Sequence, residues 1–298
     1  VEAGKRFGIP VLGTMAHSWV MSFDEEIDAF REYVRQYHDN LILLADTYNV
    51  LEMGVPHAIQ VFKELKEEGR LPGKYGIRID SGDIAYLSQE ATRMFTEAGF
   101  PDAIISGSND LDEYTIQSLK AQGCTVTSWG VGTKIITADG TSALGGVFKM
   151  AVKEADGKEV PVMKFSNDVE KMTNPGIKTV YRFYKKDTGK MITDLVCLHD
   201  EKAADGGDFT LVTESAKWRR KELKAGTYTV EELLRPVIEN GRNLPLPVLP
   251  EIIRYADKQM DTLWPEYTRL LNPDLMEINL SDKLQTLKSE LIRRELGE

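Results

Sequence analysis

The first half of the chain alternates short apolar runs with longer amphipathic stretches, and this alternation constrains the fold more than any other feature. The apolar runs are partly β-branched and bounded by Gly, Asp or Ser, as is typical of strands buried on both faces. They are residues 9–12, 41–44, 75–79, 103–105 and 125–129. The stretches with apolar residues at helical spacing are 22–37, 55–68, 84–98 and 112–122. We therefore expect five strands, the first four each followed by a helix, in a parallel sheet that is either doubly wound or closed into a barrel.

End signals support the predicted helices. Ser22 and Glu25 have the spacing of a capping box ahead of the first helix, in which each side chain satisfies a free backbone N–H of the other residue. Gly69, Gly99 and Gly123 follow the next three helices. Glycine is the residue that most easily adopts the left-handed conformation that ends a helix.

After about residue 149 the pattern changes to that of an antiparallel β region. Strands are predicted at 148–153, 160–165, 179–184 and 191–198, with hairpin turns at 156–158 and 187–190. The last third is predicted to be mostly helical, with a capping box at Thr229 and Glu232 and helices over 250–271 and 281–296. These patterns divide the chain into a βα core with the active-site loops at 1–149, an antiparallel β-rich region at 150–245 and a helical segment at 246–298.

Composition excludes several classes of protein. The formal net charge of −10 argues against non-specific nucleic-acid binding, which needs a basic face. No apolar run approaches the roughly 20 residues of a membrane-spanning helix, and no charged-then-apolar leader opens the chain. The two cysteines, Cys124 and Cys197, are too few for a disulfide framework or a four-cysteine metal site. We expect a cytoplasmic protein with no nucleic-acid or membrane partner.

Each predicted parallel strand is followed by a small, polar, glycine- or asparagine-containing loop. These loops are residues 13–19, 45–49, 80–83, 106–110 and 130–134. Any one of them alone is ordinary turn chemistry. Because ligands bind at the carboxyl ends of the strands in parallel α/β folds, five such loops together predict a ligand site at that edge.

Four residues in or directly before these loops have side chains suited to particular chemistry. Asp80 and Asp83 are either two solvated carboxylates or ligands for a sugar diol or Mg²⁺. Arg78 lies inside an apolar strand, where its guanidinium needs an anion, either Asp80 or a ligand carboxylate. His17 lies among small residues at a strand end, which leaves a structural and a catalytic role equally open.

The loop at 130–134 suits a phosphate monoester. Gly130 and Gly132 allow backbone N–H groups to approach an anion closely, and Thr133 adds a hydroxyl donor. The loop matches neither the P-loop spacing nor the dinucleotide fingerprint.

Six motifs, taken together and in this order, resemble those of the nicotinate phosphoribosyltransferase family. They are GTMAHS at 13–18, RIDSGD at 78–83, GSN at 107–109, GVGTK at 130–134, LGGVFK at 144–149 and KMTNPGIK at 171–178. The resemblance implies an irregular or incomplete α/β barrel of the type II phosphoribosyltransferase kind, followed by the antiparallel β region and C-terminal helices. It implies that nicotinate and phosphoribosyl pyrophosphate form nicotinate mononucleotide and pyrophosphate in NAD salvage, with coupled ATP hydrolysis, Mg²⁺ as cofactor and a homodimer as the assembly.

The resemblance also implies roles for individual residues. His17 would be the histidine that ATP phosphorylates transiently, and Asp80 would be the second catalytic residue. Thr14 and Arg78 would contact nicotinate, whereas Asp46, Asp80 and Asp83 would hold the ribose hydroxyls or Mg²⁺. The full implied substrate-binding set is Thr14, Asp46, Arg78, Ser81, Gly82, Asp83, Gly107, Ser108, Asn109, Gly130, Gly132, Thr133 and Lys149, with Lys178 as a further phosphate neighbour.

Two alternatives stand beside this reading. The first is a related pyridine phosphoribosyltransferase acting on nicotinamide or quinolinate. Arg78 favours a single carboxylate, since a hydrogen bond to a charged group contributes roughly 1.5–3 kcal/mol. The second is an inactive truncated chain that keeps only ligand binding or a dimerisation surface. It is suggested by the start at Val1 without an initiator methionine, where the family is expected to carry a preceding segment. An aldolase that uses Lys134 as a Schiff-base amine is disfavoured, because a neighbouring phosphate would raise the pKa of that amine.

Overall fold

The structure, a computed structural model, describes residues 1–167, 171–203, 207–213 and 220–297. The chain forms two compact units, Val1–Gly145 and Gly146–Glu298. Each unit has its own sheet and its own buried cluster of side chains.

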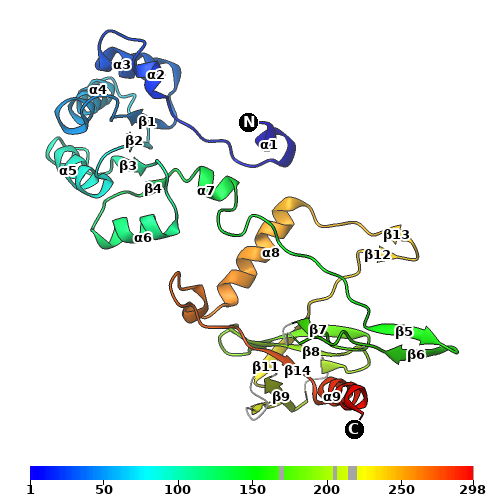
Figure 1. The fold of residues 1–298 in the computed structure, drawn as a ribbon. Helices are drawn as coiled ribbons and strands as arrows, with labels where there is room; N and C mark the ends of the chain where they lie inside the picture. The colour runs from blue at the N-terminus through cyan, green and yellow to red at the C-terminus, as the bar shows by residue number, and fades with distance from the viewer. Residues whose placement is uncertain (168–170, 204–206, 214–219, 298) are drawn as a thin grey trace. The chain divides into compact units, whose positions relative to one another are not determined.

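The first unit contains a parallel sheet of four strands in sequential order, β1-β2-β3-β4 (Figure 1). The strands are β1 (Leu41–Leu44), β2 (Tyr75–Ile79), β3 (Ile104–Gly107) and β4 (Ser128–Trp129). The helices are α1 (Glu2–Phe7), α2 (His17–Val20), α3 (Glu26–Gln36), α4 (Val55–Glu67), α5 (Ile84–Glu97), α6 (Glu113–Ala121) and α7 (Thr133–Ile136), with a π-helix at Val50–Gly54. The predicted α/β class is confirmed, as are the helices that became α4, α5 and α6.

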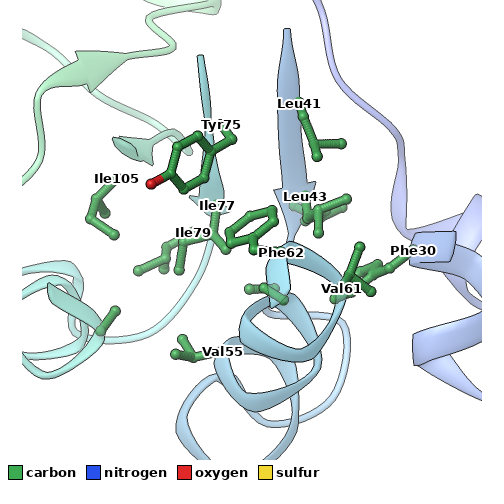
Figure 2. Packing of buried hydrophobic residues seen from close by; sticks show 14 of the residues in the cluster. Phe30, Leu41, Leu43, Val55, Val61, Phe62, Tyr75, Ile77, Ile79 and Ile105 are labelled. Atoms are coloured by element: carbon green, nitrogen blue, oxygen red, sulfur yellow. The ribbon is translucent and has the colours of Figure 1, made fainter. Parts of the chain in front are cut away.

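One face of this sheet packs against helices. Side chains alternate across a strand, so Leu41 and Leu43 of β1 share a face with Tyr75, Ile77 and Ile79 of β2 and enter one buried cluster. Figure 2 shows the side chains of β1 and β2 gathered around those of α4. These residues form the main core of the unit, and the helix-covered face explains their near-complete burial.

The opposite face of the sheet borders a pocket of about 510 Å³. We call it the pocket face. Its strand residues are Ile42, Arg78, Ile104, Ser106, Ser128 and Trp129. Paired residues of parallel strands lie side by side on the same face, so Arg78, Ser106 and Ser128 form one row across β2, β3 and β4. Ile42, Gly76 and Ile104 form the row below it.

The expected first strand at residues 9–12 is wrong. These residues form no strand, and Leu12 is 84% exposed. A β-strand persists only when a neighbour takes up its backbone hydrogen bonds, and β1 is paired with β2 alone. The sheet of residues 1–145, all of which are described, is therefore open at β1 and β4, and a closed barrel is not formed there.

The capping box expected at Ser22 and Glu25 is also wrong. Helix α3 begins at Glu26, and Glu25 occupies its N-cap position without a side-chain hydrogen bond. The Ser22 hydroxyl instead donates to the carbonyl oxygen of Trp19 at 2.6 Å. Because this hydroxyl is hydrogen-bonded within the turn that ends α2, it does not cap α3. By contrast, Gly69, Gly99 and Gly123 all have the left-handed φ expected of helix ends.

The second unit is built around a mixed six-stranded sheet of order β10-β9-β14-β8-β7-β11. Its strands are β7 (Lys178–Lys185), β8 (Met191–Leu198), β9 (Phe209–Thr213), β10 (Arg220–Leu223), β11 (Tyr228–Glu232) and β14 (Ile278–Leu280). The unit also contains two hairpins, β5 (Val152–Ala155) with β6 (Lys158–Pro161) and β12 (Ile238–Glu239) with β13 (Arg242–Asn243). Its helices are α8 (Leu249–Thr262), a 3-10 helix (Pro265–Thr268) and α9 (Asp282–Leu296). The β7–β8 hairpin and the helix that starts after Ser281 are confirmed.

Three expectations for the second unit need correction. The strands predicted at 148–153 and 160–165 are displaced toward the turn, because Asp156 and Gly157 both have positive φ and close a two-residue loop between Ala155 and Lys158. The capping box at Thr229 and Glu232 lies instead in β11, whose residues pair with β7. The helix predicted over 250–271 ends at Thr262, since Pro265 disfavours a helical residue before it.

Candidate functional site

The carboxyl ends of the four parallel strands bring together most of the predicted site residues of the first unit. Asp46 follows β1, Asp80 follows β2, Ser108 follows β3 and Gly130 follows β4. His17 is the first residue of the short helix α2. Parallel strands end at one edge of a sheet, so the predicted meeting of these loops is realised.

Asp46 joins the first two of these loops. Its side chain is 1% exposed. One carboxylate oxygen, Oδ2, accepts hydrogen bonds from the backbone N–H of Asp80 at 2.8 Å and from the Ser81 hydroxyl at 2.6 Å. The other oxygen, Oδ1, is buried and has no hydrogen-bond partner among the described residues. A buried carboxylate oxygen without a donor is costly, and it is therefore available to a cation or to a ligand hydroxyl.

His17 lies against this carboxylate. Its Nδ1 is 3.1 Å from the hydroxyl oxygen of Thr47, and its Nε2 is 3.9 Å from Oδ1 of Asp46 and 3.7 Å from Oδ2 of Asp80. The side chain is 40% exposed, so the ring remains reachable from solvent. If Nδ1 carries the proton and donates to Thr47, Nε2 keeps its lone pair and faces the two carboxylates.

Arg78 is held by three partners that converge on its guanidinium. Nε donates to the Ser108 hydroxyl at 2.8 Å, and Nη1 donates to the Thr14 hydroxyl at 2.9 Å. Nη2 is 3.2 Å from Oδ1 of Asp80, which also accepts a hydrogen bond from the Ser108 hydroxyl. From the sequence, the anion that pairs with this arginine could be either Asp80 or a ligand carboxylate. The structure supplies Asp80 and leaves the guanidinium at the wall of the pocket.

Asp80 is kept ionised by these neighbours. Burial raises the pKa of its carboxyl, but the hydrogen bond from Ser108 and the charges of Arg78 and His17 outweigh burial, and the net shift is downward.

Asp83 is the N-cap residue of the helix that follows. Its Oδ1 accepts from the backbone N–H of Tyr86 at 3.0 Å and caps α5, which leaves one carboxylate oxygen of this exposed residue free.

The phosphate-loop candidates fall into two groups. Gly107, Ser108 and Gly130 are adjacent, because Gly130 N–H donates to the Gly107 carbonyl at 2.8 Å and a Cβ on Gly130 would lie 3.2 Å from the Ser108 Cβ. Gly132 and Thr133 lie one turn further on, at the start of the four-residue helix α7. Within residues 1–145, the Thr133 side chain makes no hydrogen bond to the cluster around His17.

The other predicted residues have local roles or lie in the second unit. Asn109 has a φ of 81°, and its side-chain oxygen accepts from the N–H of Asp110. Gly82 has a φ of 79°, which glycine adopts without strain. Lys149 is exposed and belongs to the second unit, as does Lys178, whose half-buried ammonium donates to the Gly176 carbonyl at 2.5 Å and whose pKa is lowered by burial.

The residues present fit a magnesium ion held together with a substrate. The described part of the chain has no group of three His, Cys, Asp or Glu side chains that could hold a metal alone. Mg²⁺, however, usually takes one or two carboxylates and completes its shell with water and substrate phosphates. Asp80, kept ionised, and the free oxygen of Asp83 are carboxylate donors of this kind. The Oδ1 of Asp46, which is buried without a hydrogen-bond partner among the described residues, is a further acceptor in the loop after β1.

Sequence reasoning missed two residues near the site, Thr47 and Glu26. Thr47 orients His17, as described above. Glu26 is fully buried at the start of α3, with Oε2 2.7 Å from Nδ1 of His57 and Oε1 without a partner among the described residues. Burial raises the pKa of Glu26, and the hydrogen bond and charge of His57 only partly offset this. An acidic residue in a first helical turn is common, so nothing in the sequence marks Glu26 as buried.

Comparisons with known proteins found relatives of this chain. A family model described as the nicotinate phosphoribosyltransferase C-terminal domain matches residues 177–288. A nicotinate phosphoribosyltransferase of Bacillus subtilis is 39% identical over 296 residues, which are 98% of this chain and 59% of that protein. One of Bos taurus is 30% identical, with 99% of this chain and 63% of that protein covered.

Solved structures agree. The crystal structure of human nicotinic acid phosphoribosyltransferase matches with a TM-score of 0.75 at 27% identity, and the match covers 97% of this chain and 63% of that one. A nicotinate-nucleotide pyrophosphorylase from Pyrococcus furiosus, at 20% identity and a TM-score of 0.57, shares the fold. The chain thus spans about three fifths of the length of the relatives it matches. Of the helices in the described residues, none has the length and apolar character needed to cross a bilayer.

Proposed function

This chain belongs to the nicotinate phosphoribosyltransferase family, and we propose that the protein of which it forms part joins nicotinate to phosphoribosyl pyrophosphate, yielding nicotinate mononucleotide and pyrophosphate. The observation that carries the proposal is the position of Arg78. Its guanidinium lies at the wall of the 510 Å³ pocket, directly beside the carboxylate of Asp80, whose backbone N–H is bound by Asp46. A carboxylate-binding group and a ribose-binding group are thus neighbours, as a pyridine carboxylate and a ribose must be when they react.

The guanidinium favours an acid over an amide as the pyridine substrate. Asp80 and the hydroxyls of Ser108 and Thr14 occupy three of the five N–H donors of Arg78, which leaves one on each terminal nitrogen. Those two donors suit the two oxygens of a carboxylate. Quinolinate carries a second carboxylate, and the only other cationic residue of the described pocket lining, Lys74, lies four residues earlier along the chain at the far end of β2.

The carboxylates supply the electrostatic part of the proposed chemistry. When the bond between C1 of the ribose and its pyrophosphate breaks, positive charge develops on the sugar. The pyridine nitrogen of nicotinate then donates its electron pair to C1, and pyrophosphate leaves with the electrons of the broken C–O bond. Asp80, ionised because of its lowered pKa, and Asp46 are fixed before the ligand arrives. Charges fixed in this way stabilise the transition state without reorganisation.

The glycine loops would hold the 5′-phosphate. The N–H groups of Ser108 and Gly130 already donate to the carbonyls of Ile79 and Gly107. The donors we propose for the phosphate are therefore the N–H groups of Gly132 and Thr133 and the Thr133 hydroxyl, at the start of α7, with Gly107, Ser108 and Gly130 as small neighbours. Mg²⁺, held by Asp80 and Asp83, would neutralise pyrophosphate oxygens when bound.

His17 is the proposed acceptor in ATP coupling. The Thr47 hydroxyl fixes Nδ1, which leaves Nε2 as the nucleophile toward the γ-phosphorus of ATP. The N–P bond forms as the bond from phosphorus to the bridging oxygen of ADP breaks, and ADP leaves with that electron pair. The carboxylates of Asp46 and Asp80 are within 4 Å of Nε2 and would stabilise the cationic ring of the phosphohistidine.

The proposal extends to the assembly of the whole protein. The four-stranded sheet is open at β1 and β4, so further strands of a full-length protein would complete an irregular barrel around the pocket face. A homodimer and a cytoplasmic location complete the proposal. Both cysteines are free thiols, as suits a reducing compartment.

The test uses the full-length protein. Nicotinate, phosphoribosyl pyrophosphate, Mg²⁺ and ATP are mixed with the protein, each is then omitted in turn, and nicotinate mononucleotide is measured. Nicotinate, nicotinamide and quinolinate are next placed in competition. We expect product formation with nicotinate preferred, at a rate that ATP increases. A preference for either of the other pyridines would reassign the substrate, and no product with any of the three would overturn the proposal.

A further inference from the structure

The row of polar residues on the pocket face has two members with no assigned role. Arg78 pairs with Ser106 across β2 and β3, and Ser106 pairs with Ser128 across β3 and β4. Because the strands are parallel and the pairs are in register, the three side chains project from the same face at the same height. All three line the 510 Å³ pocket. The row therefore presents one guanidinium and two hydroxyls to the same ligand.

Neither serine hydroxyl is used by the fold. The guanidinium of Arg78 binds Ser108, Thr14 and Asp80, and no hydrogen bond joins the side chain of Ser106 or Ser128 to any described residue. Ser108 shows the contrast, because its hydroxyl accepts from Arg78 and donates to Asp80. Ser106 is half-buried and Ser128 is exposed to the pocket, so both hydroxyls are free to meet a ligand.

The surroundings restrict which part of a ligand these hydroxyls can bind. The row below Arg78, Ser106 and Ser128 consists of Ile42, Gly76 and Ile104, which offers no side-chain polar group. A flat ring resting on that apolar row would place its polar substituent at the level of the hydroxyls and the guanidinium. Two hydroxyl donors and two free N–H donors of Arg78 match a carboxylate, which has about four acceptor positions. A carboxamide would direct N–H donors at the guanidinium.

We propose that Ser106 and Ser128 are specificity-determining residues that donate hydrogen bonds to the carboxylate of the pyridine substrate. The inference rests on the proposed function and deepens it, because it assigns the selection of acid over amide to a three-residue row. Arg78 supplies the charge, and the two serines bind the carboxylate lone pairs that the guanidinium does not reach. Their short side chains also leave the room that the ring requires.

The experiment compares Ser106→Ala, Ser128→Ala and the double variant of the full-length protein with the wild type. Ser118→Ala, on the exposed surface of α6, is the matched control. Loss of a hydrogen bond to a charged group predicts a roughly tenfold higher KM for nicotinate in each single variant. We expect kcat and the KM for phosphoribosyl pyrophosphate to stay within about twofold. The preference for nicotinate over nicotinamide should fall by the same factor, and Ser106→Thr, which keeps a hydroxyl, should restore much of it.

Calorimetric titration with nicotinate and nicotinamide provides a readout that does not depend on turnover. If the wild type makes no product, the proposed function fails, but a tenfold weaker affinity of the alanine variants for nicotinate alone would still support the inference. Several results would overturn it: an unchanged KM and affinity for nicotinate, an equal loss for acid and amide, or a matching rise in the KM for phosphoribosyl pyrophosphate. The absence of nicotinate binding to the wild type would also overturn it.

Discussion

Replacing Arg78 by lysine separates the charge of this residue from its geometry. The guanidinium serves three partners at 2.8, 2.9 and 3.2 Å and sits 26% exposed at the pocket wall. A lysine ammonium keeps the positive charge but concentrates it on one nitrogen, which cannot reach the same three partners together with a ligand. Losing two hydrogen bonds to hydroxyls, each contributing about 1 kcal/mol, predicts a loss of about 2 kcal/mol in the free energy of unfolding. For a unit of this size that corresponds to a fall of roughly 4–8 °C in Tm.

The effect on the substrate should be larger and selective. A two-pronged, charge-assisted contact contributes roughly 1.5–3 kcal/mol, so Arg78→Lys should lower kcat/KM for nicotinate roughly 10- to 150-fold. The value for nicotinamide should change much less. The assay is initial-rate kinetics with each pyridine at saturating phosphoribosyl pyrophosphate, alongside thermal unfolding.

Arg78→Met distinguishes charge from shape. It removes the cation that helps to lower the pKa of Asp80, so the pKa of that carboxyl should rise in Arg78→Met but not in Arg78→Lys. Since a lowered carboxyl pKa contributes stability that is lost as the pH falls through the folded-state value, Arg78→Met should gain less stability than wild type as the pH rises through the acid range. Wild-type kcat/KM for nicotinate in Arg78→Lys would refute the assignment of this residue to the carboxylate.

Two further predictions concern His17 and Glu26. His17→Asn should abolish transfer of the γ-phosphoryl group of ATP to an acid-labile position on the protein and should remove the stimulation of product formation by ATP, and retention of labelled phosphoryl would contradict the proposed acceptor. Glu26→Gln should gain stability relative to wild type as the pH rises from about 4 to 7. The pKa of Glu26 is raised by burial, so its contribution to stability is present below the unfolded value and lost as the pH rises through the folded one. Urea unfolding at several pH values measures this difference, and a gap that does not widen toward neutral pH would contradict the reasoning.

The parts of the fold that were predictable depend on short-range signals. Helices α4, α5 and α6 carry apolar periodicity and end at glycines with left-handed φ, and both signals lie within each helix or beside it. The errors come from distant partners. Residues 9–12 have the composition of a strand, but no neighbouring strand pairs with them. Glu232 has the spacing of a helix cap, but its carboxylate accepts a hydrogen bond at 2.6 Å from the hydroxyl of Thr179 on the neighbouring strand β7.

The candidate site was predictable in position more than in detail. The topology of repeated βα units implies that loops after successive strands meet, which brings His17, Asp46 and Asp80 together. The sequence does not predict which carboxylate binds a neighbouring loop, which caps a helix and which keeps a free oxygen. Whether Asp83 caps α5 or faces a ligand is decided by the backbone N–H groups nearby, and a burial as complete as that of Glu26 depends on packing between α3 and α4.

The two oxygens of Asp46 have separate consequences for how this molecule can change. One oxygen holds the Asp80 backbone N–H and the Ser81 hydroxyl, and the other is buried without a hydrogen-bond donor among the described residues, 3.9 Å from Nε2 of His17. Any substitution there disturbs folding and turnover at once, so the two losses cannot be separated by mutating that position. Ser81→Ala removes one of the two hydrogen bonds to Oδ2 and leaves Oδ1 unchanged, so comparing Ser81→Ala with a substitution of Asp46 separates the anchoring of this loop from the contribution of Oδ1.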